Sequence, residues 1–364
     1  MQTLTIYDPT GDHSLGKVRG AGRVMQILRE NLTGKARFIS DLSQVSEDDI
    51  LFVPLWQPFQ KPFLRKRIAK KHILLLFDVI PLKYPEHFPI GLKGRWWLIQ
   101  NLRSLGIFDQ IITISEQSKE DLIEYLNFDE SVVDVVHLTS CKVFFKKTGQ
   151  KSLSELAKTY GLPKTPYCTY IGDTNWNKNL ITLAQGIIES GLHCVCAGQT
   201  FSLINDLRAM DVDEQHDFIA TSDLLNHHEQ IDFKEFIKLT LNDDHFIFPG
   251  YIPDEDLKQL YKHALCNILI SRDEGFGLSY LESACVECPS ILSNIPVFRE
   301  IAGSAAYFIE QDAPHELAQT LSSIVDKPTS YRAMKVKAGK RAESFTPQRF
   351  ADNLLKATLL KPTR

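Results

Sequence analysis

The sequence has 364 residues, of which 43% are hydrophobic and 24% charged, with a formal net charge of −4. This length predicts two domains, and the composition is that of an ordinary globular protein. The small negative charge gives no reason to expect a nucleic-acid partner. No apolar run approaches the ~20 residues of a membrane span.

The first residues lead straight into a strand-like pattern without the form of a signal peptide, so a cytoplasmic location is expected. The seven cysteines lie in apolar runs, which fits a reducing compartment. Cys285 and Cys288 form an isolated CxxC pair, which is interpreted as two core-facing thiols and not as a zinc site.

The first half predicts a doubly wound α/β domain, because short apolar runs alternate with helical patterns. The loop 10–22 follows the first run and carries four glycines, at the edge where such sheets bind ligands. Its glycine spacing is not that of a dinucleotide fingerprint, and an ordinary surface loop remains the alternative. The expected strands are 4–7, 50–53, 73–77, 111–114 and 132–136.

Polar residues follow two of these runs, where side chains can face a ligand crevice. Asp78 ends the run 73–77, and Ser115 ends the run 111–114. For Ser115 the following sequence Glu-Gln-Ser-Lys favours a helix cap instead.

Two basic stretches of the first half also contain aromatic residues. The stretch 56–71 has six lysines and arginines and no acidic residue, and 91–105 has three basic residues beside Trp96 and Trp97. Cations beside exposed aromatics suit an anionic membrane surface, at about 1 kcal/mol per cation. The alternative is a solvated helix face whose aromatics lie in the core.

A linker at 161–164 precedes a second series of alternating strands and helices. The polar segment 199–242 contains a helical pattern at 232–241 and is expected to be an excursion from the core. The tail 330–360 predicts two helices, the last with a single apolar stripe. The expected strands are 167–172, 193–198, 246–251, 267–270, 290–292 and 306–309.

The stretch 271–282 contains the main functional motif. It follows an apolar run and leads into a helical pattern, and two glycines between them allow a ligand to approach the backbone closely. Glu274 precedes this turn, and Glu282 lies about five residues into the expected helix, roughly 7–8 Å along its axis. Two carboxylates around an amide-rich turn suit a sugar nucleotide. Two surface glutamates at a helix start are the alternative.

These residues resemble a known family, the retaining, nucleotide-sugar-dependent glycosyltransferases of family four, also called glycosyltransferase group 1. In the first half, 20–23 is similar to the family's glycine loop, and 78–89 to a segment of bacterial surface-polysaccharide mannosyl- and rhamnosyltransferases. The motifs of the second half are Tyr170-Ile171-Gly172 with Lys178-Asn179-Leu180, Gly250-Tyr251-Ile252, and Glu274-Gly275-Phe276-Gly277-Leu278 with Glu282.

The resemblance implies the GT-B fold: two Rossmann-like, doubly wound domains facing a cleft, with a C-terminal helix crossing back to the N-terminal domain. The expected domains are an acceptor-side domain at 1–162, a nucleotide-sugar domain at 163–345, and the helix at 346–364.

The resemblance also implies a role for each matched residue. Glu282 would bind the ribose hydroxyls and Glu274 the donor sugar, while Lys178 would neutralise the diphosphate as it leaves; Glu274 and Lys178 are the implied catalytic residues. Gly22 would lie beside the leaving phosphate and the acceptor. The other implied donor-binding residues are Gly275, Phe276, Gly277, Leu278, Tyr251 and Asp78. No metal and no cofactor is expected, because no Asp-x-Asp motif stands at a suitable strand end.

The sequence departs from the family pattern at three positions. Asp173 stands where many relatives have an arginine, so a second cation on the diphosphate would come from Arg23 or Arg272, or would be missing. Phe77 replaces a histidine near the donor sugar, and Glu287 replaces a glycine at a helix end.

The predicted function is that of a retaining, metal-independent hexosyltransferase. It would move a hexose, with a slight preference for mannose from GDP-mannose, to a glycan or lipid-linked acceptor in cell-surface polysaccharide synthesis, such as that of O-antigen. The expected location is the cytoplasm, with peripheral attachment at the inner membrane face. The alternative is a non-catalytic scaffold that binds a nucleotide sugar in a glycan-assembly complex.

Overall fold

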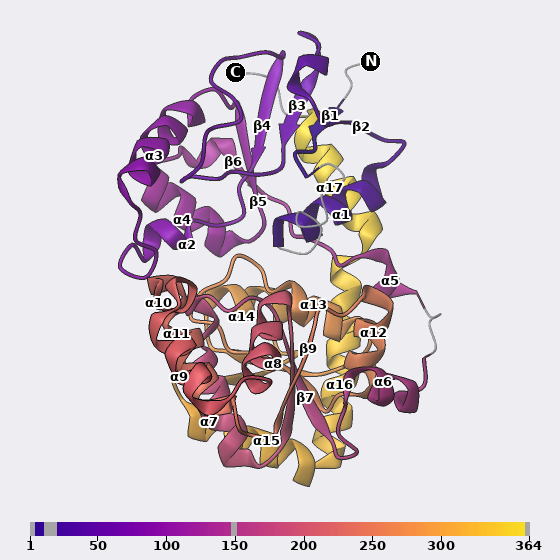
Figure 1. Ribbon diagram of the computed structural model, residues 1–364. Helices are drawn as coiled ribbons and strands as arrows, with labels where there is room; N and C mark the ends of the chain where they lie inside the picture. Colours follow the sequence, from indigo (N-terminus) through magenta and orange to yellow (C-terminus); the bar gives the residue numbers. More distant parts are fainter. Residues whose placement is uncertain (1–3, 11–19, 147–150, 361–364) are drawn as a thin grey trace. The chain divides into compact units, whose positions relative to one another are not determined.

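The computed structural model describes residues 4–10, 20–146 and 151–360. The chain divides into two compact units, one formed by 1–142 with 345–364 and the other by 143–344. Each unit contains one six-stranded parallel sheet with flanking helices (Figure 1). The predicted α/β class with two Rossmann-like sheets is therefore confirmed.

The first unit has the strand order β2-β1-β3-β4-β5-β6. Its strands are β1 (Leu4–Tyr7), β2 (Arg37–Ile39), β3 (Ile50–Val53), β4 (Lys71–Leu75), β5 (Gln110–Thr113) and β6 (Val133–Val135). Its helices are α1 (Gly20–Leu32), α2 (Ile80–Lys83), α3 (Leu92–Leu105), α4 (Glu116–Leu126) and α17 (Pro347–Leu360), with the short helices η2 (Leu42–Gln44) and η3 (Glu130–Val132).

Local sequence explains how these elements begin and end. The Ser115 hydroxyl accepts a hydrogen bond from the Ser118 amide at 3.0 Å, so it caps α4 as expected. Asn127 ends the same helix in the left-handed conformation that asparagine tolerates. The stretch 56–71 is not a helix: it is irregular up to β4, and Trp56 and Phe63 pack against the core of the unit.

The last helix, α17, packs within the first unit although it ends the chain. It contacts α1. Lys71 of β4 donates to the carbonyl of Thr358 at 3.1 Å, and Gln110 of β5 donates to that of Ala357 at 3.0 Å. These bonds anchor the last turn of α17 to the sheet.

The second unit has the strand order β12-β11-β10-β7-β8-β9. Its strands are β7 (Tyr167–Ile171), β8 (His193–Ala197), β9 (Phe246–Gly250), β10 (Cys266–Leu269), β11 (Ser290–Ser293) and β12 (Tyr307–Ile309). The chain builds outward from β7 to β9 and then returns to β10 on the other side of β7. The order therefore reverses between β7 and β10, the point where doubly wound sheets bind ligands.

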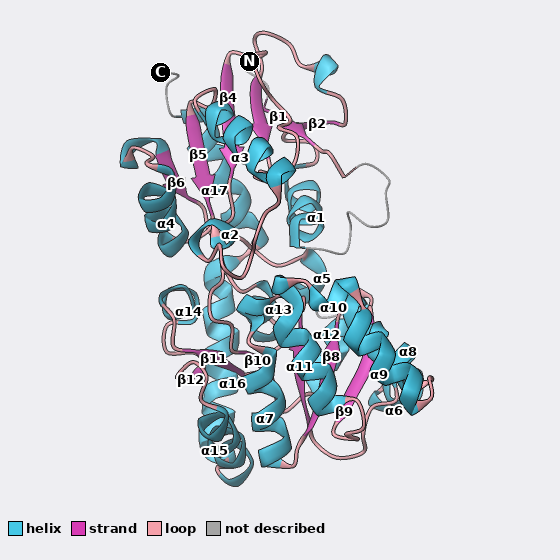
Figure 2. Ribbon diagram, turned by 60° about the vertical axis from the view of Figure 1, so that its left-hand side comes forward, coloured by secondary structure: helices cyan, strands magenta, loops and turns pink. Residues whose placement is uncertain are grey.

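The helices of the second unit pack on one another in a connected series. The helix α7 contacts α11 and α15, α15 contacts α16, α16 contacts α13, and α12 contacts α6 and α13; α7 and α11 run side by side in Figure 2. Their bounds are α6 (Leu153–Tyr160), α7 (Leu180–Ser190), α11 (Ile231–Thr240), α12 (Asp254–His263), α13 (Leu278–Ala284), α14 (Pro296–Ala302), α15 (Pro314–Asp326) and α16 (Pro328–Ala342). The short helices η4 (Trp176–Lys178), η5 (Gln199–Phe201), η6 (His228–Gln230) and η7 (Glu343–Phe345) complete the unit together with α5 (Lys142–Phe145) at its border.

The boundary between the units lies 20 residues earlier than the sequence suggested, at 142–143 instead of 162–163. The reason is the position of α6, which packs on α12. Tyr160 of α6 and Lys151 both donate to the carboxylate of Asp256 in α12, at 2.6 Å each.

The excursion 199–242 is more helical than the sequence indicated. Besides α11 it contains α8 (Ser202–Arg208), α9 (Val212–Thr221) and α10 (Asp223–Asn226). Aromatic rings join it to the sheet: Phe201 lies 5.8 Å from Tyr170 of β7 and 5.8 Å from Phe233 of α11, centroid to centroid. These rings belong to the buried core of the unit, so α11 is firmly attached to the sheet.

Glu287 takes the left-handed conformation, with φ of 58°, at the end of α13. The helix end therefore keeps the geometry that a glycine usually provides, although glutamate bears a steric cost there. Its side chain lies over Gly339 of α16, where a Cβ atom would come within 2.9 Å of the Glu287 Cγ. Gly339 thus provides the space that this glutamate needs.

Gly277 starts α13 with φ of 92° and lies against the ring of Phe298. A Cβ atom at this position would lie 2.8 Å from Phe298 Cε1, closer than real contacts allow. Both the backbone angle and the packing therefore require glycine.

We expect Gly277→Ala to lower the free energy of unfolding by about 2–4 kcal/mol, because it combines left-handed strain with a core clash. Urea denaturation would measure the loss. Gly191→Ala is the matched control: Gly191 has φ of 64° but open space around it, so only the backbone term of about 1–2 kcal/mol is expected. Equal losses in the two variants would show that the Phe298 contact has no effect.

Candidate functional site

Two loops form the candidate site at the carboxyl ends of β7 and β10. The loop 172–179 leaves β7 and contains η4, and the loop 270–277 leaves β10 and leads into α13. Because β7 and β10 are neighbouring parallel strands, both loops emerge at the same edge of the sheet, at the reversal of the strand order. The stretches that the sequence singled out, around Lys178 and Glu274, are these two loops.

Backbone and asparagine hydrogen bonds join the two loops. The Arg272 amide donates to the carbonyl of Asn177 at 2.7 Å, and the Asn177 side chain donates back to the Asp273 carbonyl at 3.0 Å. Asn179 turns the chain into α7 with φ of 55° and donates to the Ile270 carbonyl at 3.2 Å. The loops are thus fixed against each other on both sides of Lys178.

Lys178 and Glu274 meet across this junction. The Lys178 Nζ atom lies 2.6 Å from Glu274 Oε1, and the two side chains are only 17% and 12% exposed. The Ser271 hydroxyl donates to the same carboxylate oxygen at 2.7 Å. A half-buried ammonium group is therefore held next to the glycine turn by a carboxylate that has a second hydrogen-bond donor.

The turn after Glu274 brings backbone close to this pair. Gly275, Phe276 and Gly277 are buried, and Leu278 begins α13. On the β7 side, Gly172 and Gly198 approach closely: a Cβ atom on Gly198 would lie 2.4 Å from the Gly172 carbonyl oxygen. Small residues therefore line the edge of the sheet where a ligand would lie.

Tyr170, at the end of β7, holds the following loop by a hydrogen bond. Its hydroxyl donates to the Asp173 carbonyl at 2.8 Å, and its ring is buried. Burial, together with the nearby Glu274 carboxylate, raises the pKa of Tyr170 well above its usual value. The phenol therefore stays protonated and remains a donor.

Glu282 lies within α13 and Tyr251 follows β9, so neither belongs to the two joined loops. Glu282 is the fifth residue of α13 and is 3% exposed. Burial of the Cys285 thiol and the nearby charge of Glu282 both raise the pKa of that thiol. Tyr251 follows the edge strand β9, two strands from β7, and is 55% exposed.

Gly22 and Asp78, the remaining predicted site residues, belong to the first unit. Gly22 is buried in the first turn of α1, which follows β1. Asp78 follows β4 and accepts a hydrogen bond from the Ile80 amide at 3.2 Å, which turns the chain into α2. Most of the glycine loop, residues 11–19, lies outside the described residues.

Arg272 does not have the free guanidinium expected of a second diphosphate cation. It pairs with Asp232 at 2.6 Å and with Asp312 at 3.3 Å, and it lies 5.0 Å above the Trp176 ring. Arg23, the other candidate, donates to Gln26 at 3.2 Å.

Cysteines and histidines form no metal site in the part of the chain that the structure describes, which holds no cluster of three or more metal-ligating side chains. Cys288 is buried, and burial raises the pKa of its thiol to about 12. Cys288 therefore faces the core as a protonated thiol, whereas Cys285, also predicted to face the core, is partly exposed.

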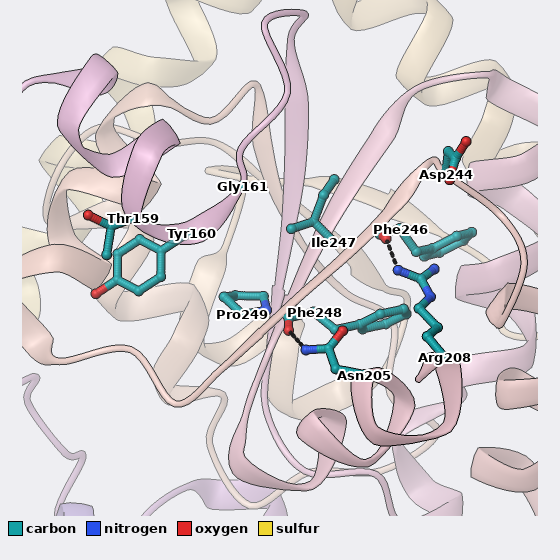
Figure 3. Close-up of a pocket in the computed structure, with 10 residues that line it drawn as sticks. All are labelled: Thr159, Tyr160, Gly161, Asn205, Arg208, Asp244, Phe246, Ile247, Phe248 and Pro249. Atoms are coloured by element: carbon teal, nitrogen blue, oxygen red, sulfur yellow. Dashed lines mark hydrogen bonds between the residues drawn. The ribbon is translucent and has the colours of Figure 1, made fainter. Parts of the chain in front are cut away.

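A pocket of about 430 Å³ lies along the outer edge of β9 (Figure 3). Asn205 donates to the Phe248 carbonyl at 2.5 Å, and Arg208 donates to the Phe246 carbonyl at 3.4 Å. These side chains point toward the strand (Figure 3), so they protect an open sheet edge. The pocket is separate from the β7–β10 junction, because β8 lies between β9 and β7.

Sequence reasoning missed the residues that connect the loops. Asn177 and Asn179 flank the predicted lysine, and Ser271 lies three residues before the predicted glutamate. The paired asparagines around a lysine were the available signal, since asparagine favours left-handed turns and side-chain to backbone bonds.

Three curated bacterial mannosyltransferases are similar to this chain. Serotype-specific mannosyltransferase WbdA of Escherichia coli is 35% identical over 27% of this chain and 11% of that protein. O-antigen chain mannosyltransferase B of Escherichia coli is 24% identical over 71% of this chain and 62% of that protein. O-antigen chain mannosyltransferase RfbU of Salmonella typhimurium is 22% identical over 73% and 63%. The alignments thus span less than two thirds of each relative.

Solved structures share the fold. HepE of Anabaena in complex with UDP-glucose is 12% identical and has a TM-score of 0.65, over 98% of this chain and 99% of that one. WaaG, a glycosyltransferase involved in lipopolysaccharide biosynthesis, is 10% identical with a TM-score of 0.65, over 99% and 100%. These neighbours are GT-B glycosyltransferases. Residues 163–341, which include the β7 and β10 loops, match the model of the Glycosyl transferases group 1 family, so the second unit contains a domain of that family.

Proposed function

We propose that the protein is a retaining glycosyltransferase that uses a nucleoside-diphosphate sugar as donor. The observation that carries the proposal is the Lys178–Glu274 pair, which lies beside a glycine turn at the switch point of the second sheet. Family membership of the same segment supports it.

The chemistry of the site suits a diphosphate leaving group. Negative charge builds up on the diphosphate as the glycosidic bond breaks, so fixed donors near it stabilise the transition state more than the ground state. Lys178 and the amides of the turn 275–278 are such donors, and Glu274 is a partner for sugar hydroxyls. Glu282 would hold the ribose.

The mechanism we propose is substitution on one face of the sugar. The bond from the anomeric carbon to the diphosphate oxygen breaks, and a bond from the acceptor oxygen forms on the same face. The acceptor's proton passes to the departing diphosphate oxygen. Lys178 balances the charge of that oxygen, so the proposed reaction needs neither a metal ion nor another cofactor.

We propose mannose as the sugar, from GDP-mannose, and a glycan or lipid-linked acceptor of surface polysaccharide synthesis. The three curated relatives described above are mannosyltransferases, two of them of the O-antigen chain. The structural neighbour HepE was solved with UDP-glucose, so uridine donors belong in the same screen.

We expect Lys178→Ala and Glu282→Ala each to lower kcat/KM for sugar transfer by about a hundredfold or more, because each removes a charged side chain proposed to contact the sugar nucleotide. The assay is transfer from a panel of GDP- and UDP-sugars, monitored by release of the nucleoside diphosphate. Lys262→Ala, on the exposed side of α12, is the matched control and should keep wild-type turnover.

Near-normal turnover in both variants would reject the proposed site. Nucleotide binding to the wild type without transfer to any acceptor would favour the scaffold alternative instead. Thermal shift with GDP, UDP and their sugars gives this binding readout, because a ligand of the folded state raises the melting temperature.

We also propose that α3 lies on an anionic membrane surface, where it would bring the enzyme to lipid-linked acceptors. One side of this helix exposes large apolar residues, with Leu92 86%, Trp96 57% and Ile99 46% exposed. Lys93 and Arg95 flank them, and α3 contains no acidic residue. An exposed apolar patch of this kind marks an interaction site, and its cations favour anionic lipid. Among the described residues, no helix is long and apolar enough to cross a bilayer.

We expect the double variant Lys93→Glu with Arg95→Glu to bind vesicles at least about tenfold more weakly, at ~1 kcal/mol per cation. Co-sedimentation with phosphatidylcholine vesicles, with and without phosphatidylglycerol, measures the binding. Lys35→Glu, an exposed lysine of the same unit, is the control. Equal binding to vesicles with and without phosphatidylglycerol would contradict the proposal.

A further inference from the structure

Arg272 connects four segments around the candidate site. It lies in the β10 loop, two residues before Glu274, and its backbone amide donates to Asn177 of the β7 loop. Its guanidinium donates to Asp232 of α11 at 2.6 Å and to the Trp176 carbonyl of η4 at 2.6 Å. The carbonyl of Arg272 accepts a hydrogen bond from Gln311, in the loop after β12, at 2.8 Å.

Arg272 and its partner Asp232 are both largely buried. The arginine side chain is 16% exposed and that of Asp232 only 9%. The guanidinium also lies over the indole of Trp176, with 5.0 Å between its central carbon and the ring centroid. A buried ion pair costs desolvation energy, so this one is better explained by positioning than by stability.

Asp232 is itself fixed, because α11 is anchored in the core. The next residue, Phe233, and Phe236 are both fully buried, and each lies 5.8 Å from the Phe201 ring. The segment before α11 also contacts the β7 loop: Thr174 donates to Gln230 at 2.7 Å, and Gln230 donates to Asn175 at 2.9 Å. The excursion 199–242 therefore contacts the loop that carries Lys178 at two points.

We propose that Arg272 and Asp232 position Lys178: the pair clamps η4 between α11 and the β10 loop and so directs the lysine toward the diphosphate. Arg272 is then a positioning residue and does not itself contact the phosphates. This inference rests on the proposed function, and it assigns to the excursion a role in the donor site.

The direction in which Asp232→Asn changes the affinity for a nucleoside diphosphate distinguishes two roles of Arg272, positioning Lys178 or binding phosphate directly. Asp232→Asn removes the charge that holds the guanidinium but keeps a hydrogen-bonding side chain of the same shape. If Arg272 only positions Lys178, loosening it weakens binding of a nucleoside diphosphate. If Arg272 binds phosphate directly, removing its competing carboxylate leaves binding unchanged or tightens it.

The test is calorimetric titration of the full chain with UDP and GDP, and with the matching nucleoside, for the wild type and four variants. The variants are Lys178→Ala, Asp232→Asn, the double variant of these, and Glu235→Gln, which removes an exposed charge from the same helix as a control. We expect Asp232→Asn to weaken diphosphate binding about tenfold and Glu235→Gln to have no effect. In the Lys178→Ala background, Asp232→Asn should cause no further loss, because the two residues act through one contact.

Each other outcome has a distinct meaning. Unchanged or tighter diphosphate binding in Asp232→Asn, or additive losses in the double variant, would overturn the positioning role while the proposed function stands. An equal loss of affinity for the nucleoside would also overturn it, since general damage to the domain would then explain the change. A wild type that binds neither diphosphate would reject the proposed function, and this inference with it.

Discussion

The candidate site depends on the attachment of two loops to each other at one point of the second sheet. Strand order reverses between β7 and β10, so the loops leaving these strands diverge and would leave a crevice. Hydrogen bonds from Asn177 and Asn179 hold the loops together at its base. Lys178, between the two asparagines, is thereby placed against Glu274. The placement of Lys178 beside Glu274 follows from this junction.

Hydrogen bonds among the side chains of the two loops explain why polar groups can be buried at this junction. Lys178 and the Ser271 hydroxyl both donate hydrogen bonds to the Glu274 carboxylate, so these polar groups have partners. In the proposed reaction, a diphosphate would replace the Glu274 oxygen as the anionic partner of Lys178, and the carboxylate would then be available to the sugar. The ion pair keeps both groups partly desolvated, which would lower the cost of organising them around the proposed donor.

The sequence predicted the features that local patterns encode. Long apolar runs such as 167–172 give the strands, and the motifs around Lys178 and Glu274 give the two loops that meet at the β7–β10 junction. β2 was missed because it has only three residues and its first, Arg37, is exposed. The helices α8 to α10 were missed because the segment is polar and few residues of each helix, such as Ile219 of α9 and Leu225 of α10, reach the core. The ion pair between Arg272 and Asp232 could not be predicted, because the two residues lie 40 positions apart in the sequence and only the fold brings them together.

The most direct test of the central claim is a crystal structure of the protein with bound GDP or UDP. The account predicts a phosphate oxygen within hydrogen-bonding distance of Lys178 Nζ, the amides of 275–278 directed at the diphosphate, and the ribose at Glu282. A diphosphate bound elsewhere, for example along the β9 edge, with Lys178 still paired to Glu274, would contradict it.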